Sequence, residues 1–391
     1  MPPIWGRFYW IDQEYSDIVF LIMSSGISVE FLQFLKSIPI FTPREIFQKI
    51  QGMGYIGQER ACKAVCLMAF RHLNRIRKIF LDGVQRNLLP PKENMLLLGP
   101  TGCGKTFLVE LLFREVLKIP AVIIDITSYS ETGYIGQDVN QLLTKLVYAA
   151  DGDLYKASIG IVCIDEFDKI SSGKNTAVFA GQGTTKDVTG LGVQRELLKM
   201  LEQAEIDIPV ELSHSGYAPR VSFNTRDVPF LACGAFSGFR QVLNYFTSDE
   251  NIGFTRSRTD TGISTPLNRE EVEKAANFEA YGILPELIGR FARIIPFTPL
   301  SKEELTAILE QNTVNRYRHE LTLDKIQLHI ESAVYKFIVD KCIKRETGAR
   351  GLDTFLTEYL EDACFDAYST KKKDLKMTIF LADKKIQWDI N

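Results

Sequence analysis

The chain has 391 residues, of which 45% are apolar, so it is long enough to bury a substantial core in two or three domains. Its 46 basic and 49 acidic residues nearly cancel, which leaves no overall field to attract nucleic acid or an anionic membrane. We therefore predict a globular protein whose partners are neither nucleic acids nor membranes.

The cysteines and apolar stretches favour a soluble protein in a reducing compartment. The seven cysteines lack the spacing of a disulfide framework. Cys62 and Cys66 lie four residues apart without a second Cys or His pair, so we predict buried helix positions and no zinc. The stretch 18–35 is interrupted by serines and Glu30, and the N-terminus lacks a basic start. We predict a cytoplasmic protein, with an organelle matrix as the alternative.

The first element with a clear start signal follows a divergent, aromatic-rich segment, 1–41. Thr42-Pro43-Arg44-Glu45 has the pattern of an N-cap, a proline at the first helical position and a charged first turn. A longer helical pattern follows Ile56-Gly57-Gln58 and continues to about Phe80. These helices are expected to open a large domain, 42–299.

A glycine-rich segment, 99–106, is the strongest signal in the chain and is called the phosphate loop below. It fits GxxxxGK[ST] and lies between a strand pattern, 95–98, and a helical pattern, 107–117. Such a turn directs backbone N–H groups and a helix N-terminus at one point, where phosphate binds. A chance Gly/Ser/Thr turn is the alternative, but it would not need both flanking elements. We predict an ATP site with Lys105 on the β- and γ-phosphates and the Thr106 hydroxyl on Mg²⁺. The loop residues expected to contact the nucleotide are Gly99, Pro100, Thr101, Gly102, Cys103, Gly104, Lys105 and Thr106.

A second apolar strand pattern, 159–164, ends in Asp165 and Glu166. In a parallel sheet, strand ends place such carboxylates beside the phosphate loop. We predict that Asp165 holds Mg²⁺ and that Glu166 orients and polarises the attacking water. An apolar strand ending in Asp-Glu is common by itself, and it predicts a catalytic role here because a phosphate loop precedes it in the sequence.

The remaining patterns predict an α/β fold, with a central parallel sheet flanked by helices and a smaller, mainly helical C-terminal domain, 300–391. A capping box at Ser301-Lys302-Glu303-Glu304 opens that second domain. Strands are expected at 95–98, 121–125, 159–164, 228–236 and 293–297, with further short candidates at 328–330 and 377–381, and helices at 138–150 and 193–203.

Together these elements resemble the ClpX family of AAA+ ATPases over roughly 41–370. The resemblance implies that Ile56 lies beside the adenine, that Arg290 enters the neighbouring subunit's site as an arginine finger, and that Arg350 contacts phosphates of its own subunit. A lone arginine is usually a solvated surface charge, so both arginine roles rest on the resemblance. The matching segments are Ile56-Gly57-Gln58, 99–106, 164–170, 192–199, 284–290 and 347–352.

Two loops carry the further implications of this resemblance. Gly133-Tyr134-Ile135-Gly136 resembles the pore loop in which an aromatic–aliphatic pair, here Tyr134 and Ile135, grips a moving polypeptide; an aromatic packed beside a turn is the alternative. Ile252-Gly253-Phe254 resembles the tripeptide that docks onto a ClpP-type peptidase. Its place before the arginine-finger segment favours ClpX over HslU.

The chain departs from the family's pattern in four places. Its first 61 residues contain no cysteine, so we do not expect them to form the four-cysteine zinc domain that is usual in this family. The stretch 211–220 lacks the Arg-Lys-His triplet of the pore entrance, Cys103 replaces a commoner Ser, and no Asn or Thr marks a sensor-1 position near Gly234. Recruitment through a zinc domain and recognition of the usual degradation tags are therefore not implied.

The resemblance implies a homohexameric unfoldase and translocase that uses ATP and Mg²⁺ to deliver unfolded or tagged proteins to a ClpP-type peptidase. The chain itself is not expected to cut peptide bonds, because its four histidines lie outside recognisable nucleophile motifs. Two alternatives stay open. An AAA+ nucleic-acid motor or clamp loader is opposed by the near-neutral charge and the 133–136 loop. An ATP-switched binding scaffold is opposed by the presence of both Glu166 and Arg290.

Overall fold

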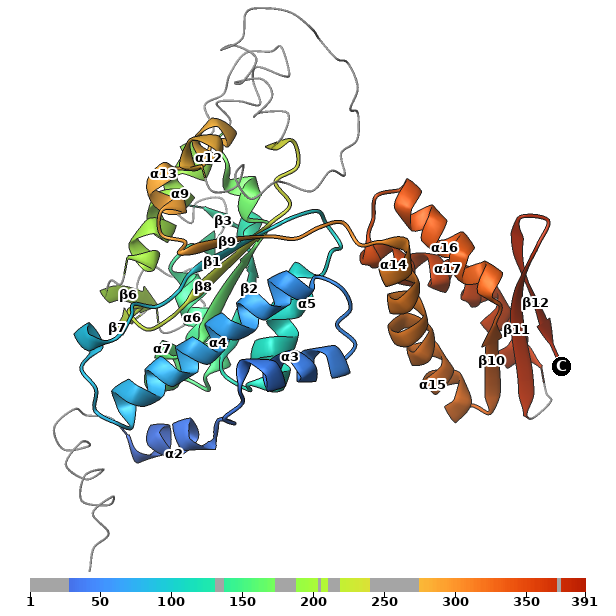
Figure 1. Ribbon diagram of the computed structural model, residues 1–391, viewed down its shortest axis with the longest axis horizontal. Coiled ribbons are helices and arrows are strands. Elements are labelled where there is room, and N and C mark those ends of the chain that lie inside the picture. Colours follow the sequence, from blue (N-terminus) through green and yellow to red (C-terminus); the bar gives the residue numbers. More distant parts are fainter. Residues whose placement is uncertain are drawn as a thin grey trace, which may run out of the picture.

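The computed structural model describes residues 28–130, 137–172, 188–202, 205–209, 219–239, 274–370 and 374–391. Figure 1 shows a parallel sheet wrapped by helices and, beside it, a smaller C-terminal body of helices and strands. Within these ranges, no helix combines the length and hydrophobicity needed to cross a bilayer.

Five parallel strands form the central sheet, in the order β2 (Ala121–Asp125), β5 (Ile161–Asp165), β8 (Phe230–Gly234), β1 (Met95–Leu98) and β9 (Arg293–Pro296). All four residues of β1 are buried, as expected of a strand covered on both faces. The five strands predicted from the sequence are thus confirmed. Their order puts β1 between β8 and β9, so the chain leaves β1 near the middle of the sheet's carboxyl edge.

Helices cover both faces of the sheet, and the sheet separates two hydrophobic cores. Met95 and Leu97 of β1 belong to one core, whereas Leu96 and Leu98 belong to the other, as the strand alternation requires. The first core is closed by α2 (Val29–Ser37), α3 (Pro43–Gly52), α4 (Glu59–Phe80), α5 (Lys105–Glu110) and η2 (Leu111–Val116). The second is closed by α6 (Gln141–Ala149), α9 (Val188–Leu201), α12 (Ala275–Tyr281) and α13 (Pro285–Ile288).

Several helix boundaries differ from the sequence-based expectation. The N-cap predicted at Thr42 and the proline predicted at the first position of α3 are present, and Thr42 and Glu45 bond each other's backbone N–H in a capping box. The helix expected over 107–117 begins at Lys105 and becomes π-helical as η2. The remaining elements around the sheet are η1 (Arg86–Leu88), η3 (Ile126–Ser128), β3 (Tyr129–Ser130), β4 (Gln137–Asp138), α7 (Leu154–Ser158), η4 (Phe167–Ile170) and an antiparallel hairpin of β6 (Glu205–Pro209) and β7 (Arg220–Asn224).

The C-terminal small domain has a core of its own, and its mainly helical character agrees with the prediction. It opens with the predicted capping box, in which Ser301 Oγ accepts from Glu304 N at 3.1 Å and Glu304 accepts from Ser301 N at 2.8 Å. The domain boundaries at 42 and 300 stay predictions. Its elements are α14 (Lys302–Ile308), η5 (Leu309–Val314), α15 (Asn315–Leu323), β10 (Ile326–Ile330), α16 (Ser332–Lys344), α17 (Ala349–Ser369), β11 (Leu375–Ala382) and β12 (Lys385–Ile390), whose strands form one sheet in the order β10-β11-β12.

Candidate nucleotide site

The phosphate loop folds back around the side chain of Lys105, the first residue of α5. The Lys105 ammonium is buried and donates to Gly99 O at 2.6 Å and to Pro100 O at 2.9 Å. These two carbonyls hold the cation inside the loop, and no carboxylate among the described residues forms an ion pair with it. An anion brought to the loop would meet this charge together with the first backbone N–H groups of the helix.

Thr106 and Asp165, the two predicted Mg²⁺ ligands, lie in direct contact although Thr106 belongs to the first turn of α5 and Asp165 is the last residue of β5. Thr106 Oγ1 donates to Asp165 Oδ2 at 2.8 Å, and the other carboxylate oxygen accepts from Glu166 N at 2.9 Å. Hydroxyl and carboxylate oxygens are ligands that Mg²⁺ accepts. The donor set therefore fits the predicted ion.

Glu166, the predicted general base, follows the last residue of β5 in an unusual backbone conformation. Its φ of 55° and ψ of 32° lie in the left-handed region, which costs free energy for a residue with a Cβ. Such residues cluster at functional sites because the surrounding structure must hold them there. The half-buried side chain thus leaves the strand end beside Asp165.

Ile56, the predicted adenine-side residue, is half-buried next to a tyrosine that contacts the loop. Tyr55 donates its hydroxyl to Gly104 O at 3.4 Å, and its ring stacks on Phe107 with centroids 6.1 Å apart. Gln58 joins this segment to the end of the sheet domain, since its amide donates to Thr298 O at 2.6 Å. The structure therefore brings 55–58 to the phosphate loop.

The small domain also touches the phosphate loop. Ala349 N donates to Gly102 O at 3.0 Å. Gly102 has a φ of +74°, and a Cβ there would lie 2.4 Å from Thr347 O, so this position requires glycine. Arg350 is the next residue of α17 and its side chain is exposed. The predicted phosphate-contacting residue, Arg350, thus lies in the first turn of α17, which contacts the phosphate loop.

Arg290 lies away from the other candidate residues of its own chain. It precedes β9, at the edge where the strands begin, whereas the phosphate loop follows the opposite end of β1. The length of a four-residue strand, roughly 13 Å, separates these edges. The exposed guanidinium forms an ion pair with Glu202. Within one chain, Arg290 does not complete the nucleotide site.

The predicted gripping and docking residues lie outside the described residues. These are Tyr134 and Ile135 of the pore-loop match and Ile252, Gly253 and Phe254 of the docking match.

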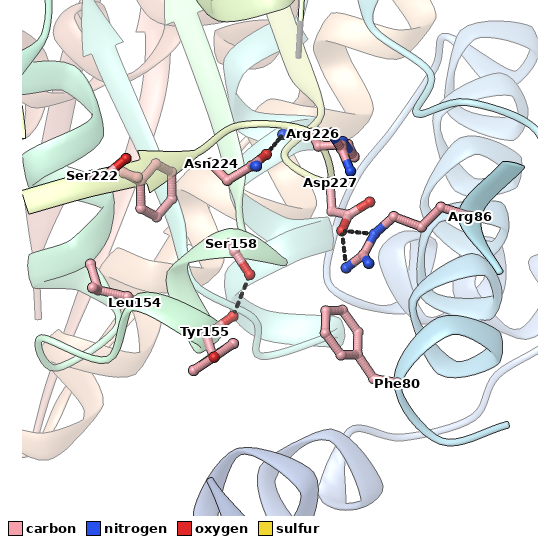
Figure 2. Close-up of a pocket in the computed structure, with 10 residues that line it drawn as sticks. Phe80, Arg86, Leu154, Tyr155, Ser158, Ser222, Asn224, Arg226 and Asp227 are labelled. Atoms are coloured by element: carbon pink, nitrogen blue, oxygen red, sulfur yellow. Dashed lines mark hydrogen bonds and ion pairs between the residues drawn. The ribbon is translucent and has the colours of Figure 1, made fainter. Parts of the chain in front are cut away.

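A pocket of about 340 Å³ opens at the edge opposite the phosphate loop, and Figure 2 shows its lining. Ser158 precedes β5 and Asp227 precedes β8, so the pocket lies where these strands begin. No residue of the phosphate loop lines it. Its lining consists of Phe80, Arg86, Leu154, Tyr155, Ser158, Ser222, Phe223, Asn224, Arg226 and Asp227.

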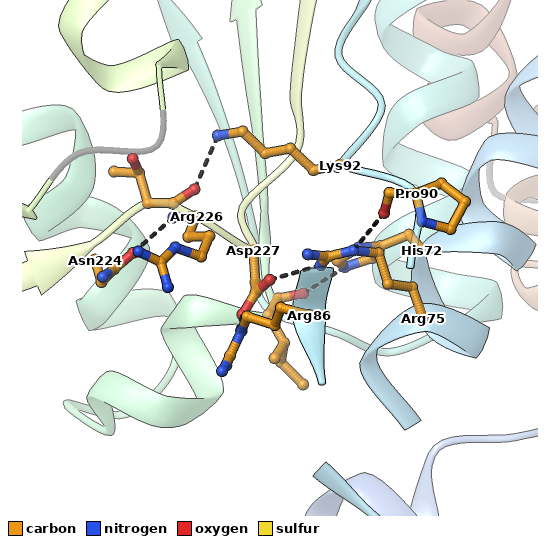
Figure 3. A network of polar contacts seen from close by, with 10 residues as sticks. His72, Arg75, Arg86, Pro90, Lys92, Asn224, Arg226 and Asp227 are labelled. Atoms are coloured by element: carbon orange, nitrogen blue, oxygen red, sulfur yellow. Dashed lines mark hydrogen bonds and ion pairs between the residues drawn. The ribbon is translucent and has the colours of Figure 1, made fainter. Parts of the chain in front are cut away.

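The same edge holds a buried polar network, shown in Figure 3. Asp227 accepts from Arg75 at 2.6 Å and from Arg86 at 3.0 Å, so its charge is compensated. Lys92 donates to Thr225 O at 2.8 Å, and burial lowers the pKa of its ammonium to about 7. These contacts tie α4 and the chain before β1 to the segment before β8, a structural role.

Asp168, Asn94 and Gln194 are buried polar residues to which the sequence analysis assigned no role. Asp168 Oδ1 accepts from Ala235 N at 3.0 Å and so joins η4 to the chain after β8. Asn94 and Gln194 both bond the chain around Arg290. Asp168 and Gln194 lie inside segments that matched the family, and this match was the signal that could have pointed to them. Asn94 is a single amide before a strand, and such a residue has no distinguishing pattern in a sequence.

Comparisons with known proteins cover most of the chain. The family model for the AAA domain (Cdc48 subfamily) matches residues 90–294, and the model for the C-terminal, D2-small domain of ClpB protein matches 300–379. The ATP-dependent Clp protease ATP-binding subunit ClpX of Borrelia duttonii is 35% identical over 357 residues, which are 89% of this chain and 79% of the relative. The proteins of the same name from Treponema denticola and Bacteroides thetaiotaomicron are 32% identical over 344 residues and 31% identical over 359. Those alignments span 85% and 90% of this chain, and 79% and 83% of the relatives.

Proposed function

Because this chain belongs to the ClpX-like AAA+ ATPases, we propose that it hydrolyses ATP to unfold and translocate polypeptides. Six copies would form a ring that feeds a ClpP-type peptidase. The observation that supports ATP turnover most directly is the contact of Thr106 with Asp165 beside the Lys105 loop. The relatives are named as ATP-binding subunits of a protease, which supports the coupling to protein degradation.

In this proposal ATP is the substrate and each residue of the site has one task. Lys105 exchanges its two carbonyl acceptors for phosphate oxygens. Thr106 and Asp165 would hold Mg²⁺, which neutralises phosphate charge when bound. Glu166, fixed at the end of β5, orients and polarises the water that attacks the γ-phosphate.

Arg290 acts on the neighbouring subunit's ATP, and Arg350 acts on that of its own subunit. The ion pair of Arg290 with Glu202 is solvent-exposed, and such pairs are worth about 0–1 kcal/mol, so the guanidinium is free to change partner. In GTPases, a finger supplied in trans contributes on the order of 10³–10⁵ in rate. Because Ala349 bonds Gly102, phosphate at the loop and the position of the small domain depend on each other.

The substrate-handling roles rest on the family resemblance. Tyr134 and Ile135 are proposed to grip the polypeptide in the pore, and Ile252, Gly253 and Phe254 to enter apolar clefts of the peptidase. In both cases a few apolar side chains on a polar loop supply contact area without sequence-specific hydrogen bonds.

Glu166→Gln tests the enzymatic half of the proposal. The amide keeps the size of the side chain but cannot accept a proton, so we expect ATP binding to be retained and turnover to fall by roughly 10² or more. Unfolding of a stable fluorescent protein with an unstructured tail should stop in parallel. Glu110→Gln is the matched control, because Glu110 is a carboxylate of α5 in an exposed pair with Arg114.

Unchanged phosphate release by Glu166→Gln would remove Glu166 from the role of base. Sustained turnover by the unaltered protein, stimulated by DNA and without any unfolding, would instead indicate a nucleic-acid motor. ATP binding without sustained turnover would indicate a switched scaffold.

Tyr134→Ala tests the mechanical half. Loss of the ring removes contact area with the polypeptide but leaves the nucleotide site intact, so ATP turnover should change less than about twofold while unfolding stops. Tyr148→Ala, at an exposed tyrosine of α6, is the control and should keep both activities. Normal unfolding by Tyr134→Ala would show that Tyr134 packs in the fold instead.

A further inference from the structure

The segment before Arg290 is bonded, through one buried amide, to the end of the turn that follows the subunit's own Glu166. We propose that Gln194 is a positioning residue for Arg290, and that through it the finger a subunit lends is held by the turn next to that subunit's own Glu166. The inference rests on the proposed role of Arg290 in the neighbouring site.

Gln194 is fully buried on α9, and its amide bonds three backbone groups from two distant segments. Its nitrogen donates to Ile170 O at 2.7 Å and to Gly282 O at 3.1 Å. Its oxygen accepts from Leu284 N at 2.7 Å. Both ends of the amide are thus used, one toward the end of η4 and the other toward the residue before α13.

A second set of bonds joins the same two segments directly. Ser172 donates to Gly282 O from its backbone N at 2.9 Å and from its Oγ at 3.1 Å. Gly282 has a φ of +102°, and a Cβ there would lie 2.5 Å from Ser172 O, so no side chain fits between these two segments of the chain. The turn after α12 is therefore packed backbone to backbone on the turn after η4.

The other end of the chain around Arg290 is also fixed by a buried amide. Asn94 donates to Arg290 O at 3.1 Å and accepts from Phe230 N at 3.0 Å, which binds Arg290 to the starts of β1 and β8. Ala292 N donates to Asn94 O at 2.9 Å. The carbonyl of Arg290 is thus held at this edge of the sheet. The direction in which the backbone reaches Arg290 depends on α13, and Gln194 holds the residue before that helix, Leu284.

The bond from Gln194 to Ile170 leads back to Glu166 within one helical turn. Glu166 is the N-cap of η4, Lys169 N donates to Glu166 O at 2.9 Å, and Ile170 ends the turn. Asp168 in the same turn holds the chain after β8 at 3.0 Å. A displacement of η4 when the subunit's own site changes state therefore shifts the acceptor of Gln194, and with it the start of α13.

Mixed rings separate this role from an effect on the subunit's own site. Arg290→Ala subunits keep all residues of their own site but lend no finger, and Glu166→Gln subunits lend a finger but do not turn over ATP. We expect Arg290→Ala alone to be inactive and an excess of Glu166→Gln subunits to restore its turnover. With Glu166→Gln/Gln194→Met subunits instead, the restored turnover should fall roughly 10-fold to 100-fold, because small misplacements of a catalytic group cost this much.

Thr144→Val, combined with Glu166→Gln, is the matched control. Thr144 is 1% exposed and donates to Pro209 O at 2.9 Å, so its loss removes a buried hydrogen bond on α6, away from Arg290. This control should restore turnover as well as Glu166→Gln alone. Light scattering of each mixture confirms that rings of equal size are compared.

Full restoration by the Gln194→Met double variant would overturn the inference. No restoration by Glu166→Gln alone, or full activity of Arg290→Ala alone, would overturn the proposed finger and the inference with it, so the two failures are distinguishable. If Gln194→Met subunits fail to fold, Ser172→Ala in the same background loses one bond onto Gly282 O. A severalfold reduction is expected there, and undiminished restoration would contradict the inference.

Discussion

Lys105 and Thr106 are adjacent in the sequence, yet their side chains are held by different parts of the site. The ammonium is held by carbonyls of its own loop and the hydroxyl by Asp165 at the end of another strand. Cys103, where the family more often has Ser, is buried, and burial raises the pKa of its thiol although Lys105 Nζ lies 3.8 Å away. The thiol stays protonated at neutral pH, so this departure adds no negative charge to a site that must accept phosphate.

His72 makes the stability of the sheet domain depend on pH. Its ring nitrogen Nε2 lies 2.8 Å from Ile159 O, and burial lowers its pKa from 6.5 to about 4. The unfolded chain therefore binds a proton at His72 below pH 6.5, whereas the folded state does not until the pH approaches 4. The stabilisation of the folded state that comes from neutral His72 is complete above pH 6.5 and is lost as the pH falls toward 4.

We expect His72→Gln, whose amide can donate to the same carbonyl without titrating, to reduce this pH dependence. Between pH 7 and pH 4.5, the unaltered protein should lose on the order of 2 kcal/mol more unfolding free energy than the variant. Denaturant titrations at the two pH values measure the difference. Equal losses in both proteins would show that His72 does not control acid stability.

Among the elements, the five central strands could be predicted because buried parallel strands are nearly continuous apolar runs. Two of the strands that the sequence did not reveal are largely exposed or half-exposed: β12 alternates between exposed and half-buried residues, and three of the five residues of β6 are not buried. The change of the predicted helix into the π-helical η2 at Leu111 has no marker in the residue types.

The phosphate loop, Asp165 and Glu166 could be located from the sequence because motif spacing and the parallel-strand rule fix them locally. The partners of Gln194 could not, since they lie 24, 88 and 90 positions away and depend on how α9 crosses the end of η4. The same holds for the strand order and for the bond from Ala349 to Gly102. Long-range backbone contacts of this kind leave no local pattern.

Those candidate residues that the structure describes lie at two opposite edges of the central sheet. The phosphate loop, Asp165, Glu166 and the start of α17 share the carboxyl edge, whereas Arg290 lies at the edge where the strands begin. In the proposed function, the site of one chain therefore lacks an arginine finger, and its own Arg290 serves a neighbouring site. A ring in which each Arg290 faces the next subunit's phosphate loop uses both.

In the proposed function, ATP turnover requires a neighbour's Arg290. The most direct measurement follows phosphate release per subunit across a dilution series while mass photometry counts monomers and rings in the same samples. We expect turnover to rise in proportion to the fraction of subunits in rings and to vanish among monomers. Full turnover per subunit in samples that contain monomers alone would contradict it.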